Sequence, residues 1–396
     1  MREKIIIHFD LDSFFVSVAR LQNSSLIGMP VIVGSASTDR GVVSSASYEA
    51  RRFGVRSGMS VVKALKLIPK ACCVTNDYRI YREYSDRVFE ILLRFTPAVQ
   101  MAGIDEAYLD LTGCQLVHKR DPLQIAKLIM LAVEDEVGLP SSIGIGSTRM
   151  LAKIGSKLAK PAGILYIIRG KEDKFLSRLP VKFIPGVGPS TVAKLAKLNI
   201  NTIADLTATS QSELGSALGE YGAKLLRSAR LEDMNQPFNI KAHIVKSIGK
   251  EKTFRVDITD IEFLKSALSY LAEHISFRVN KLNFALNSLT LKVRYSNFDT
   301  VTVSKKLDEP IAESLPIYQI SLPLLTNLLA NRKGAIRLIG LTASKFSHLG
   351  FQQSLFDQEK NLKEDALGSS LNAIKENYGF NSILKARSLR YINDSN

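Results

Sequence analysis

Acidic residues interrupt apolar strand segments at two points that lie far apart in this sequence. Lys4–Phe9 is predicted to form a short apolar strand that stops at Asp10, and Asp105 and Glu106 lie at the junction between two further apolar strands. Carboxylates beside apolar strands cost free energy unless they are paired or bind a cation. Mg²⁺ suits such a site because it takes a few carboxylates and completes its shell with waters and phosphates. The pattern favours a site at which two ions could support phosphoryl transfer.

Simpler interpretations of these carboxylates stay open at this point. They could be helix caps and a polar turn. Neighbours on a regular strand point to opposite faces, so Asp105 and Glu106 converge only if the backbone bends between them. The stretch Phe9–Ser13 is also similar to the start of a haloacid-dehalogenase-type phosphatase. That family continues with a small glycine-containing turn, whereas the bulky Phe14 and Phe15 follow here.

The composition is that of a globular protein with several domains. A length of 396 residues predicts roughly two to four domains. No apolar run approaches the roughly 20 residues that cross a bilayer, and the N-terminus has no small-residue cleavage site, so we expect a cytosolic protein. Three irregularly placed cysteines and five scattered histidines indicate neither a disulfide framework nor a zinc site. Any metal should therefore be held by oxygen.

Positive charge is concentrated in one part of the chain. The formal net charge is +15, and residues 147–255 contain 19 lysines and arginines against 8 aspartates and glutamates. Such a balance can serve solubility alone. Its concentration in one region favours a polyanionic partner, because lysines and arginines displace counterions from a phosphate backbone.

Hydrophobic periodicity predicts a mixed α and β organisation. The expected strands of the first part are Lys4–Phe9, Pro30–Val33, Val99–Ile104, Ala107–Leu111 and Ser141–Gly146, and the expected helices begin at Asp12 or Ser13, span Tyr78–Arg94 and Pro122–Val137, and begin again near Ser147. Residues 180–231 contain short helices and glycine turns. Residues 242–342 complete a β-α-β-β-α-β order, which is ferredoxin-like. From Ser347 the chain is polar and tail-like.

Four segments resemble, in the same order, the motifs of the Y-family translesion DNA polymerases of the bacterial polymerase IV type. They are Asp10–Phe15, Ser47–Val55, Ile104–Asp110 and Leu151–Gly163, with Gly103 where the family often has serine. The resemblance implies an α+β multidomain protein and a low-fidelity, template-directed DNA polymerase that adds dNTPs to a primer 3′-hydroxyl during translesion synthesis. It implies a palm over 1–17 and 77–166, fingers over 18–76, a helix-hairpin-helix thumb over 167–235, a little finger over 240–345 and a C-terminal tail over 346–396.

The resemblance also implies roles for individual residues at the reaction centre. Asp10, Asp105, Glu106 and the backbone carbonyl of Leu11 would ligate two Mg²⁺ ions, with Mn²⁺ as a substitute. The side chains expected to contact the nucleotide are Phe14, Phe15, Tyr48, Arg51 and Lys160. Among them Phe15 resembles the steric gate that rejects a 2′-hydroxyl, although its spacing from Val18 is also typical of a core residue.

Further segments are predicted to hold DNA. Lys153 and Lys157 share a helix face next to the metal site, and the turn containing Gly186 and Gly188 resembles a helix-hairpin-helix, whose backbone N–H groups bind phosphate. The resemblance to a little finger adds phosphate contacts at Lys246, Lys250, Lys252, Arg255, Lys292 and Arg294.

The segment Gln352–Phe356 resembles the peptide by which bacterial polymerases dock on the sliding clamp. Leu355 and Phe356 would fill an apolar pocket while Gln352 bonds at its rim. We expect a monomer that binds primer-template DNA, dNTP and the clamp, and that acts at the nucleoid in the cytoplasm. A polymerase V catalytic-subunit type and a non-catalytic, clamp-bound DNA-binding scaffold remain as alternatives.

Overall fold

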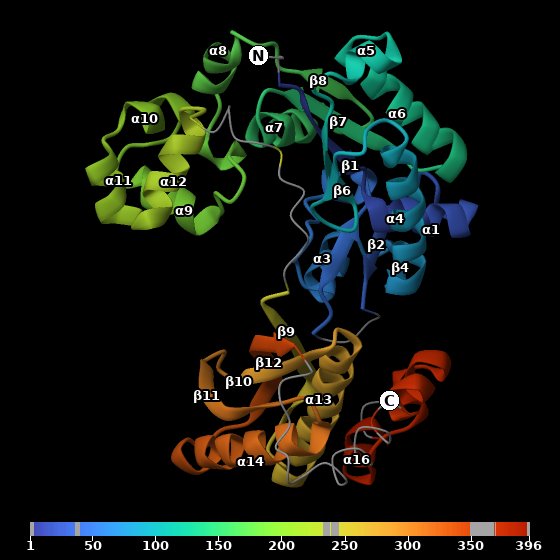
Figure 1. The fold of residues 1–396 in the computed structure, drawn as a ribbon, viewed down its shortest axis with the longest axis vertical. Helices are drawn as coiled ribbons and strands as arrows, with labels where there is room; N and C mark the ends of the chain where they lie inside the picture. The colour runs from blue at the N-terminus through green and yellow to red at the C-terminus, as the bar shows by residue number, and fades with distance from the viewer. Residues whose placement is uncertain are drawn as a thin grey trace. The chain divides into compact units, whose positions relative to one another are not determined.

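The computed structural model describes residues 4–35, 40–232, 238, 245–348, 368 and 370–393. The chain divides into two compact units, Met1–Lys241 and Ala242–Asn396 (Figure 1). The strands of the first unit are β1 Ile6–Leu11, β2 Val31–Gly34, β3 Val43–Ala46, β4 Cys72–Thr75, β5 Val99–Met101, β6 Glu106–Asp110, β7 Ser141–Gly146 and β8 Ile164–Tyr166. Its helices are α1 Phe14–Gln22, α2 Tyr48–Arg52, α3 Val61–Leu67, α4 Tyr78–Leu93, α5 Cys114–His118, α6 Pro122–Val137, α7 Arg149–Ala159, α8 Glu172–Ser177, α9 Pro189–Ala196, α10 Ile203–Ala208, α11 Gln211–Leu218 and α12 Glu220–Ala229, with short 3-10 turns at Ser24–Leu26 and Val181–Phe183.

A five-stranded sheet in the order β5-β6-β1-β7-β8 forms the centre of the first unit. Strand β1 pairs antiparallel with both β6 and β7. Alternate residues of β1 point to opposite faces. Ile7 and Phe9 lie in the main hydrophobic core with Ile125 and Ile129 of α6, whereas His8 faces α7, since it contacts Ser156. The sheet therefore places polar side chains of β1 under one helix, α7.

A three-stranded sheet, β3-β2-β4, forms a smaller layer next to this one. In β2, Val31 and Val33 belong to the main core, while Ile32 belongs to a second core with Val43 and Val61. One strand thus joins the two cores through its alternating faces. The expected strand at Pro30–Val33 is confirmed one residue further along the chain.

The helices α8 to α12 surround a third hydrophobic core. Leu151 and Ile154 of α7 contribute to this core, while other residues of the same helix face the five-stranded sheet. Helix α7 therefore connects the sheet to the helical region. The expected character of residues 180–231, short helices with glycine turns, is confirmed.

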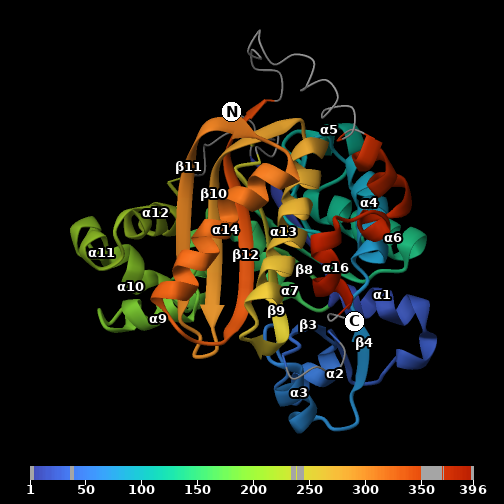
Figure 2. The same cartoon turned by 90° about the horizontal axis from the view of Figure 1, so that it is seen from below.

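The second unit contains the expected β-α-β-β-α-β succession. It is built from β9 Ser247–Ile258, α13 Ile261–Lys281, β10 Phe284–Tyr295, β11 Thr300–Ile311, α14 Ser314–Asn331 and β12 Ile336–His348. The strands lie in the order β11-β10-β12-β9, with all neighbours antiparallel. The second and fourth strands are therefore central, where a ferredoxin-like sheet has the first and third. Figure 2 shows α13 and α14 in front of the same face of this sheet.

The tail expected from 346 onward is folded over residues 370–393, where Leu371, Ile374 and Tyr378 have helical spacing. Residues 370–378 are helical, followed by a 3-10 turn at Phe380–Ser382 and helix α16, Ala386–Asn393. Tyr391 is 4% exposed and belongs to the core of the second unit. Its backbone N–H donates to Ser266 Oγ of α13 at 2.9 Å. The polar composition of residues 370–393 did not predict this packing, because only a few of their apolar side chains take part in it.

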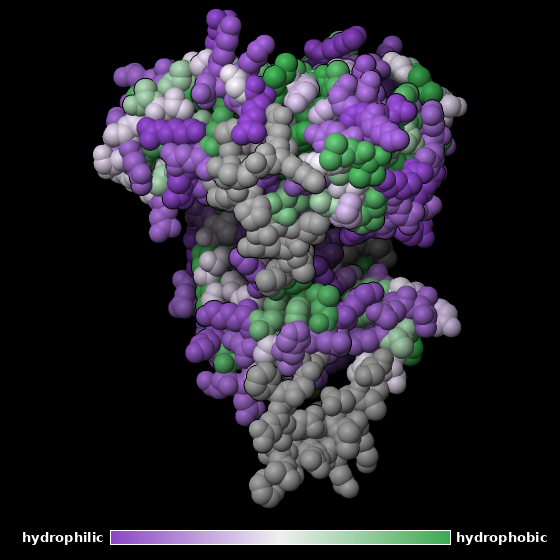
Figure 3. Space-filling model, turned by 45° about the horizontal axis from the view of Figure 1, so that its top comes forward, coloured by the Kyte–Doolittle hydropathy of each residue, from purple (hydrophilic) through white to green (hydrophobic). Residues whose placement is uncertain are grey.

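None of the described helices is long and apolar enough to cross a membrane. Hydrophilic side chains cover most of the face that Figure 3 presents.

Candidate active site

The acidic residues converge because β1 lies beside β6. Asp10 and Glu106 are directly opposite one another in the antiparallel pair, so their side chains share one face of the sheet. Asp105 precedes the first residue of β6 and lies in the bend that follows β5. Its carbonyl accepts a hydrogen bond from Leu11 N at 2.9 Å. The backbone therefore bends at Asp105, and this bend allows the side chains of Asp105 and Glu106 to approach the same site.

Gly103 leaves room for these carboxylates. A Cβ atom at this position would lie 3.2 Å from Asp105 Oδ1 and 3.9 Å from Glu106 Oε1. Both oxygens therefore flank the same small space. A serine, as in the family motif, would have to fit against the Asp105 carboxylate.

The three carboxyl groups differ in their electrostatic environment. Burial raises the pKa of Asp10, and the Lys160 ammonium partly opposes that rise. Burial also raises the pKa of Asp105, and the negative charges of Asp10 and Glu106 add to the effect. The pKa of Glu106 is lowered to about 2, chiefly by a hydrogen bond from His8 and then by Lys153. Burial thus disfavours the charged forms of Asp10 and Asp105, and a bound cation would offset that effect.

Helix α7 and the residue that follows it place two lysines on this acidic site. Lys153 Nζ lies 2.5 Å from Glu106 Oε2, and Lys160 Nζ lies 2.5 Å from Asp10 Oδ1. Lys157, predicted to share their face, instead has its Nζ 5.0 Å from the centre of the Phe183 ring. The helix therefore divides the three lysines, with Lys153 and Lys160 at the acids and Lys157 toward the helical region.

His8 is a site residue that the sequence did not reveal. His8, Asp10 and Glu106 offer ligand atoms that all lie within 4.8 Å of one another. His8 was not among the residues predicted for this site. The only available signal was its position two residues before Asp10, which puts both side chains on one strand face.

Asp12 is neither a helix cap nor exposed. Ser13 occupies the N-cap position of α1 without a side-chain cap bond. The Asp12 side chain is 1% exposed and accepts hydrogen bonds from Tyr48 Oη at 3.1 Å, Ser142 Oγ at 2.8 Å and Ala162 N at 2.7 Å. One buried carboxylate thus joins α2, β7 and the loop after α7 to β1.

Tyr48 and Arg51 lie together on α2. The Arg51 guanidinium carbon is 5.1 Å from the centre of the Tyr48 ring, and its Nε donates to Ala46 O at 3.0 Å. Burial and the Asp12 carboxylate raise the pKa of Tyr48, so its hydroxyl remains protonated. Helix α2 begins at Ser47, whose side chain accepts from Ala50 N.

The two adjacent phenylalanines have different surroundings. Phe14 is 3% exposed and part of the main core, so its ring is not available to a nucleotide, contrary to prediction. Phe15 is partly buried and stacks on Tyr81 with ring centres 4.1 Å apart. Tyr78 meets the Phe15 ring edge-on at 5.8 Å. Aromatic neighbours therefore hold the ring of Phe15, which remains partly exposed.

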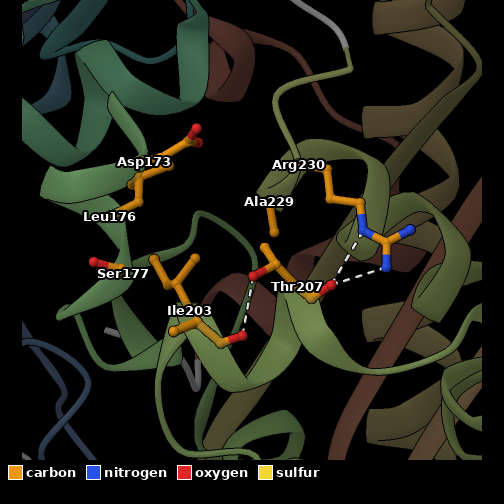
Figure 4. Close-up of a pocket in the computed structure, with 8 residues that line it drawn as sticks. Asp173, Leu176, Ser177, Ile203, Thr207, Ala229 and Arg230 are labelled. Carbon is orange, nitrogen blue, oxygen red and sulfur yellow. Dashed lines mark hydrogen bonds between the residues drawn. The ribbon is translucent and has the colours of Figure 1, made fainter. Parts of the chain in front are cut away.

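The predicted phosphate-binding turn lies before α9. Gly186 has φ +87°, a conformation that favours glycine, and Gly188 occupies the N-cap position of α9. Tyr221 Oη donates to Gly186 O at 3.0 Å. A separate hollow of about 360 Å³ lies in the same helical region, between α8, α10 and the end of α12 (Figure 4). The described residues that line it are not among the predicted site residues.

The basic residues of the second unit lie on two faces of its sheet. Lys292 and Arg294 alternate with the buried Leu291 and Val293, so they occupy the face away from the helices. The register pairs Lys250 with Leu341 and Lys252 with Ile339, both core residues. Lys250 and Lys252 therefore occupy the helix-covered side of edge strand β9, apart from Lys292 and Arg294. Lys246 and Arg255 are exposed on or beside β9.

Gln352, Leu355 and Phe356 lie outside the described residues. They belong to the stretch 349–367, which connects β12 to the helical residues near 370.

Comparison with known proteins points to one family. The impB/mucB/samB family matches residues 9–157, its C-terminal domain matches residues 245–355, and a family described as the thumb domain of DNA polymerase-iota matches residues 182–233. DNA polymerase IV of Dehalococcoides mccartyi strain BAV1 is 36% identical over 385 residues, which cover 97% of each chain. DNA polymerase IV of Clostridium kluyveri is 33% identical over 397 residues, which cover 98% of each chain.

Solved structures agree with this relationship. A chimera of the Y-family DNA polymerases Dbh and Dpo4 superimposes with a TM-score of 0.77 at 28% identity, covering 86% of this chain and 98% of that chain. An insertion ternary complex of Dbh DNA polymerase superimposes with a TM-score of 0.60 at the same identity and coverage.

Proposed function

Since this chain belongs to the impB/mucB/samB family and is a Y-family DNA polymerase of the DNA polymerase IV (DinB) type, we propose how its residues bind nucleotides and extend a primer. The chain is a template-directed, low-fidelity DNA polymerase of translesion synthesis. The observation that carries the proposal is the meeting of Asp10, Asp105 and Glu106 beside two lysines presented by α7 and its end.

We assign two Mg²⁺ ions to the acidic site, with Mn²⁺ as a substitute. Asp10, Asp105, Glu106 and the carbonyl of Leu11 would hold them, and this all-oxygen donor set suits Mg²⁺. The raised pKa values of Asp10 and Asp105 support the assignment, because burial disfavours their charged forms and a bound cation would offset that effect. When bound, such ions neutralise charge on the triphosphate and lower the pKa of the attacking hydroxyl.

Three cationic or hydroxyl-bearing side chains are assigned to the triphosphate. Lys160 lies against Asp10 and can reach an adjacent phosphate. Arg51 can form paired, charge-assisted bonds to phosphate oxygens. Tyr48 keeps its proton and can donate it. Their common function is to hold the triphosphate in line with the primer end, since orientation lowers the barrier of a transfer reaction.

Phe15 is assigned to sugar selection. Its ring is held by stacking on Tyr81, and the residue remains partly exposed. A rigid ring under the sugar would overlap a 2′-hydroxyl and so favour deoxynucleotides, because close-packed contacts tolerate extra atoms poorly.

We propose that the domains follow the hydrophobic cores. The core around β1, β6 and β7 would be the palm, that of Ile32, Val43 and Val61 the fingers, the helices α8 to α12 the thumb, and β9 to β12 the little finger. Gly186 and Gly188 would present backbone N–H groups to a DNA phosphate. Lys292 and Arg294 would contact the DNA backbone from the open face of the little-finger sheet.

We infer that the chain is a cytoplasmic monomer that docks on the sliding clamp through Gln352, Leu355 and Phe356. The support is the sequence of this peptide, which lies between two folded segments of the second unit. Removing the apolar pair by Leu355→Ala and Phe356→Ala should abolish clamp binding in solution while leaving primer extension without the clamp unchanged.

Primer extension with Mg²⁺ tests the catalytic assignment. Asp105→Ala should reduce extension by on the order of 10²–10³-fold, as expected for the loss of an electrostatic group at a reaction centre. Asp110→Asn is the matched control, because its carboxylate lies on the same strand and bonds to Thr112 N, away from the site. Equal extension by the parent and Asp105→Ala would refute the assignment and leave a DNA-binding scaffold.

A further inference from the structure

His8 is enclosed between a serine of α7 and a carboxylate of the acidic site. It is 0% exposed, and its Nδ1 lies 2.7 Å from Ser156 Oγ. Its Nε2 lies 3.3 Å from Glu106 Oε2. The ring of Tyr108, opposite His8 in the strand pair, meets the imidazole edge-on at 4.7 Å. Sheet, helix and aromatic ring together fix the plane of the imidazole.

The contacts of Ser156 determine which nitrogen of His8 carries the proton. The single hydroxyl proton of Ser156 can go to His8 Nδ1 or to Lys153 O, which lies 3.1 Å away. If it goes to Nδ1, Nε2 is the nitrogen that can carry the imidazole proton, and it lies 3.3 Å from Glu106 Oε2. This arrangement is favoured, because an unprotonated Nε2 would set a lone pair against a carboxylate oxygen.

Two glycines bring α7 close enough for this contact. A Cβ atom at Gly144, which pairs with His8 in the sheet, would lie 1.9 Å from Ala152 O and 2.2 Å from Ser156 N. A Cβ at Gly155 would lie 3.0 Å from Gly144 Cα. The backbone of α7 therefore lies directly on β7, at the height of His8. Ser156 can reach the imidazole because of this close approach.

We propose that His8, held by Ser156, is a positioning residue that orients the Glu106 carboxylate for cation binding. Both His8 and Lys153 approach Oε2 of Glu106. Oε1 lies instead on the side of Gly103, where a Cβ atom would lie within 4 Å of both Oε1 and Asp105 Oδ1, and Oε1 is the oxygen that we assign to the cation. Outer hydrogen bonds of this kind orient ligating carboxylates and strengthen metal binding. The inference rests on the function proposed for Glu106.

Mn²⁺ binding to the protein without DNA or nucleotide, measured by electron paramagnetic resonance, tests the inference. Ser156→Ala should weaken the Mn²⁺ affinity about tenfold and His8→Leu about 10–100-fold, the range usual for loss of an outer-sphere partner. His8→Gln, whose amide can still donate to Glu106, should recover part of the loss. Ser85→Ala, a buried serine of α4, is the control and should bind as the parent does.

A tautomer measurement provides a second readout that a merely structural role would not change. In ¹⁵N NMR of the parent, Nδ1 of His8 should give the shift of an unprotonated nitrogen and Nε2 that of a protonated one. Parent-like Mn²⁺ affinity in Ser156→Ala and His8→Leu, or protonation on Nδ1 alone, would overturn the inference. If His8→Leu does not fold, Ser156→Ala and the NMR shifts decide. Undiminished primer extension by Asp105→Ala would instead refute the proposed function itself.

Discussion

The Tyr48 hydroxyl donates a hydrogen bond to Asp12 Oδ1 across 3.1 Å and so ties α2 to the end of β1. While this bond exists, the single proton of the hydroxyl is not available to a phosphate oxygen. Asp12 also accepts from Ser142 and Ala162. The pair therefore holds α2 in place, and binding of a triphosphate by Tyr48, as we propose, requires this hydroxyl to exchange partners.

Changes at these two residues should have unequal effects. Tyr48→Phe removes the hydroxyl that would donate a hydrogen bond to the charged triphosphate. The KM for dNTP should therefore rise by roughly threefold to tenfold while kcat changes little. Asp12→Ala leaves the buried Ser142 hydroxyl and the Ala162 N–H without this acceptor, which should lower the free energy of unfolding by about 1–3 kcal/mol or more. Steady-state kinetics and thermal unfolding check the two results. A loss of stability in Tyr48→Phe as large as in Asp12→Ala would contradict this division of roles.

Sugar selection should depend on Phe15 and not on Phe14. Phe15→Ala removes the accessible ring and should raise ribonucleotide incorporation relative to deoxynucleotide by roughly 10–200-fold, the span usual for a steric discrimination of this size. Phe14→Ala empties a buried site and should lower stability by about 3–5 kcal/mol with unchanged sugar preference. Incorporation of rNTP and dNTP on one template measures both. Increased ribonucleotide use by Phe14→Ala alone would move the gate by one residue.

Cation binding should weaken as the pH falls. Burial raises the pKa of Asp10 and Asp105, so these groups take up protons at higher pH than ordinary carboxyl groups. Glu106, with its pKa lowered to about 2, stays ionised throughout. Protons therefore compete with the cation at the first two residues, and the affinity for Mn²⁺ should fall by at most about tenfold per pH unit for each proton displaced.

The variants separate the contributions of the three acids. Asp105→Asn should flatten this pH dependence, whereas Glu106→Gln should weaken binding by a similar factor at every pH. The same pKa shifts determine how the stability of the fold changes with pH. The lowered pKa of Glu106 stabilises the fold above its unfolded value near 4.5, and this contribution is lost as the pH falls toward about 2. The raised pKa values of Asp10 and Asp105 act in the opposite direction, because their contribution to stability is present at low pH and is lost as the pH rises. A steeper pH dependence in Asp105→Asn would contradict the assignment.

DNA binding by the second unit should depend on the face of the sheet. Arg294→Ala and Lys292→Ala should each reduce the slope of log affinity against log salt by about 1. Glu251, whose Oε1 lies 2.9 Å from Lys292 Nζ, partly neutralises this face, so Glu251→Gln should increase affinity. Lys250→Ala and Lys252→Ala, on the helix-covered side, are the matched controls. Titration of labelled primer-template at several salt concentrations measures the slopes, and equal effects on both faces would count against the assignment.

The C-terminal segment should stabilise the second unit through a buried ion pair. Glu273 is 3% exposed, and it accepts from Lys375 Nζ at 3.2 Å and from Ser388 Oγ at 2.7 Å. Lys375→Met leaves a buried charge without its partner and should lower stability by about 3–5 kcal/mol. The exposed pair Lys281–Glu376 supplies the control, because Lys281→Met should cost at most about 1 kcal/mol.

The double variant Glu273→Gln, Lys375→Met removes both charges and should recover most of the loss. Thermal unfolding of the full chain measures all four proteins. Equal stability of the parent and Lys375→Met would show that residues 370–393 contribute little to the fold.

Local patterns along the chain predicted most of the helices and strands and singled out the acidic residues. The helix at Pro122–Val137 and the strand at Ser141–Gly146 were predicted with the bounds that the structure has, since caps and periodicity are local properties. Asp10, Asp105 and Glu106 were singled out by their positions beside apolar strands, and the family resemblance predicted their role as metal ligands. Their family motifs are short and continuous, so one chain without its fold is enough to recognise them.

The side-chain contacts of these residues follow from the folded structure and not from local patterns. His8 and Ser156 are separated by 148 positions, and no local pattern predicts that two glycines bring α7 onto β7 there. The burial of Phe14, the separation of Lys250 from Lys292, and the packing of α16 on α13 also depend on register and close approach. Such contacts join segments that are distant in the sequence. They depend on the packing of the whole core, which cannot be predicted from local sequence patterns.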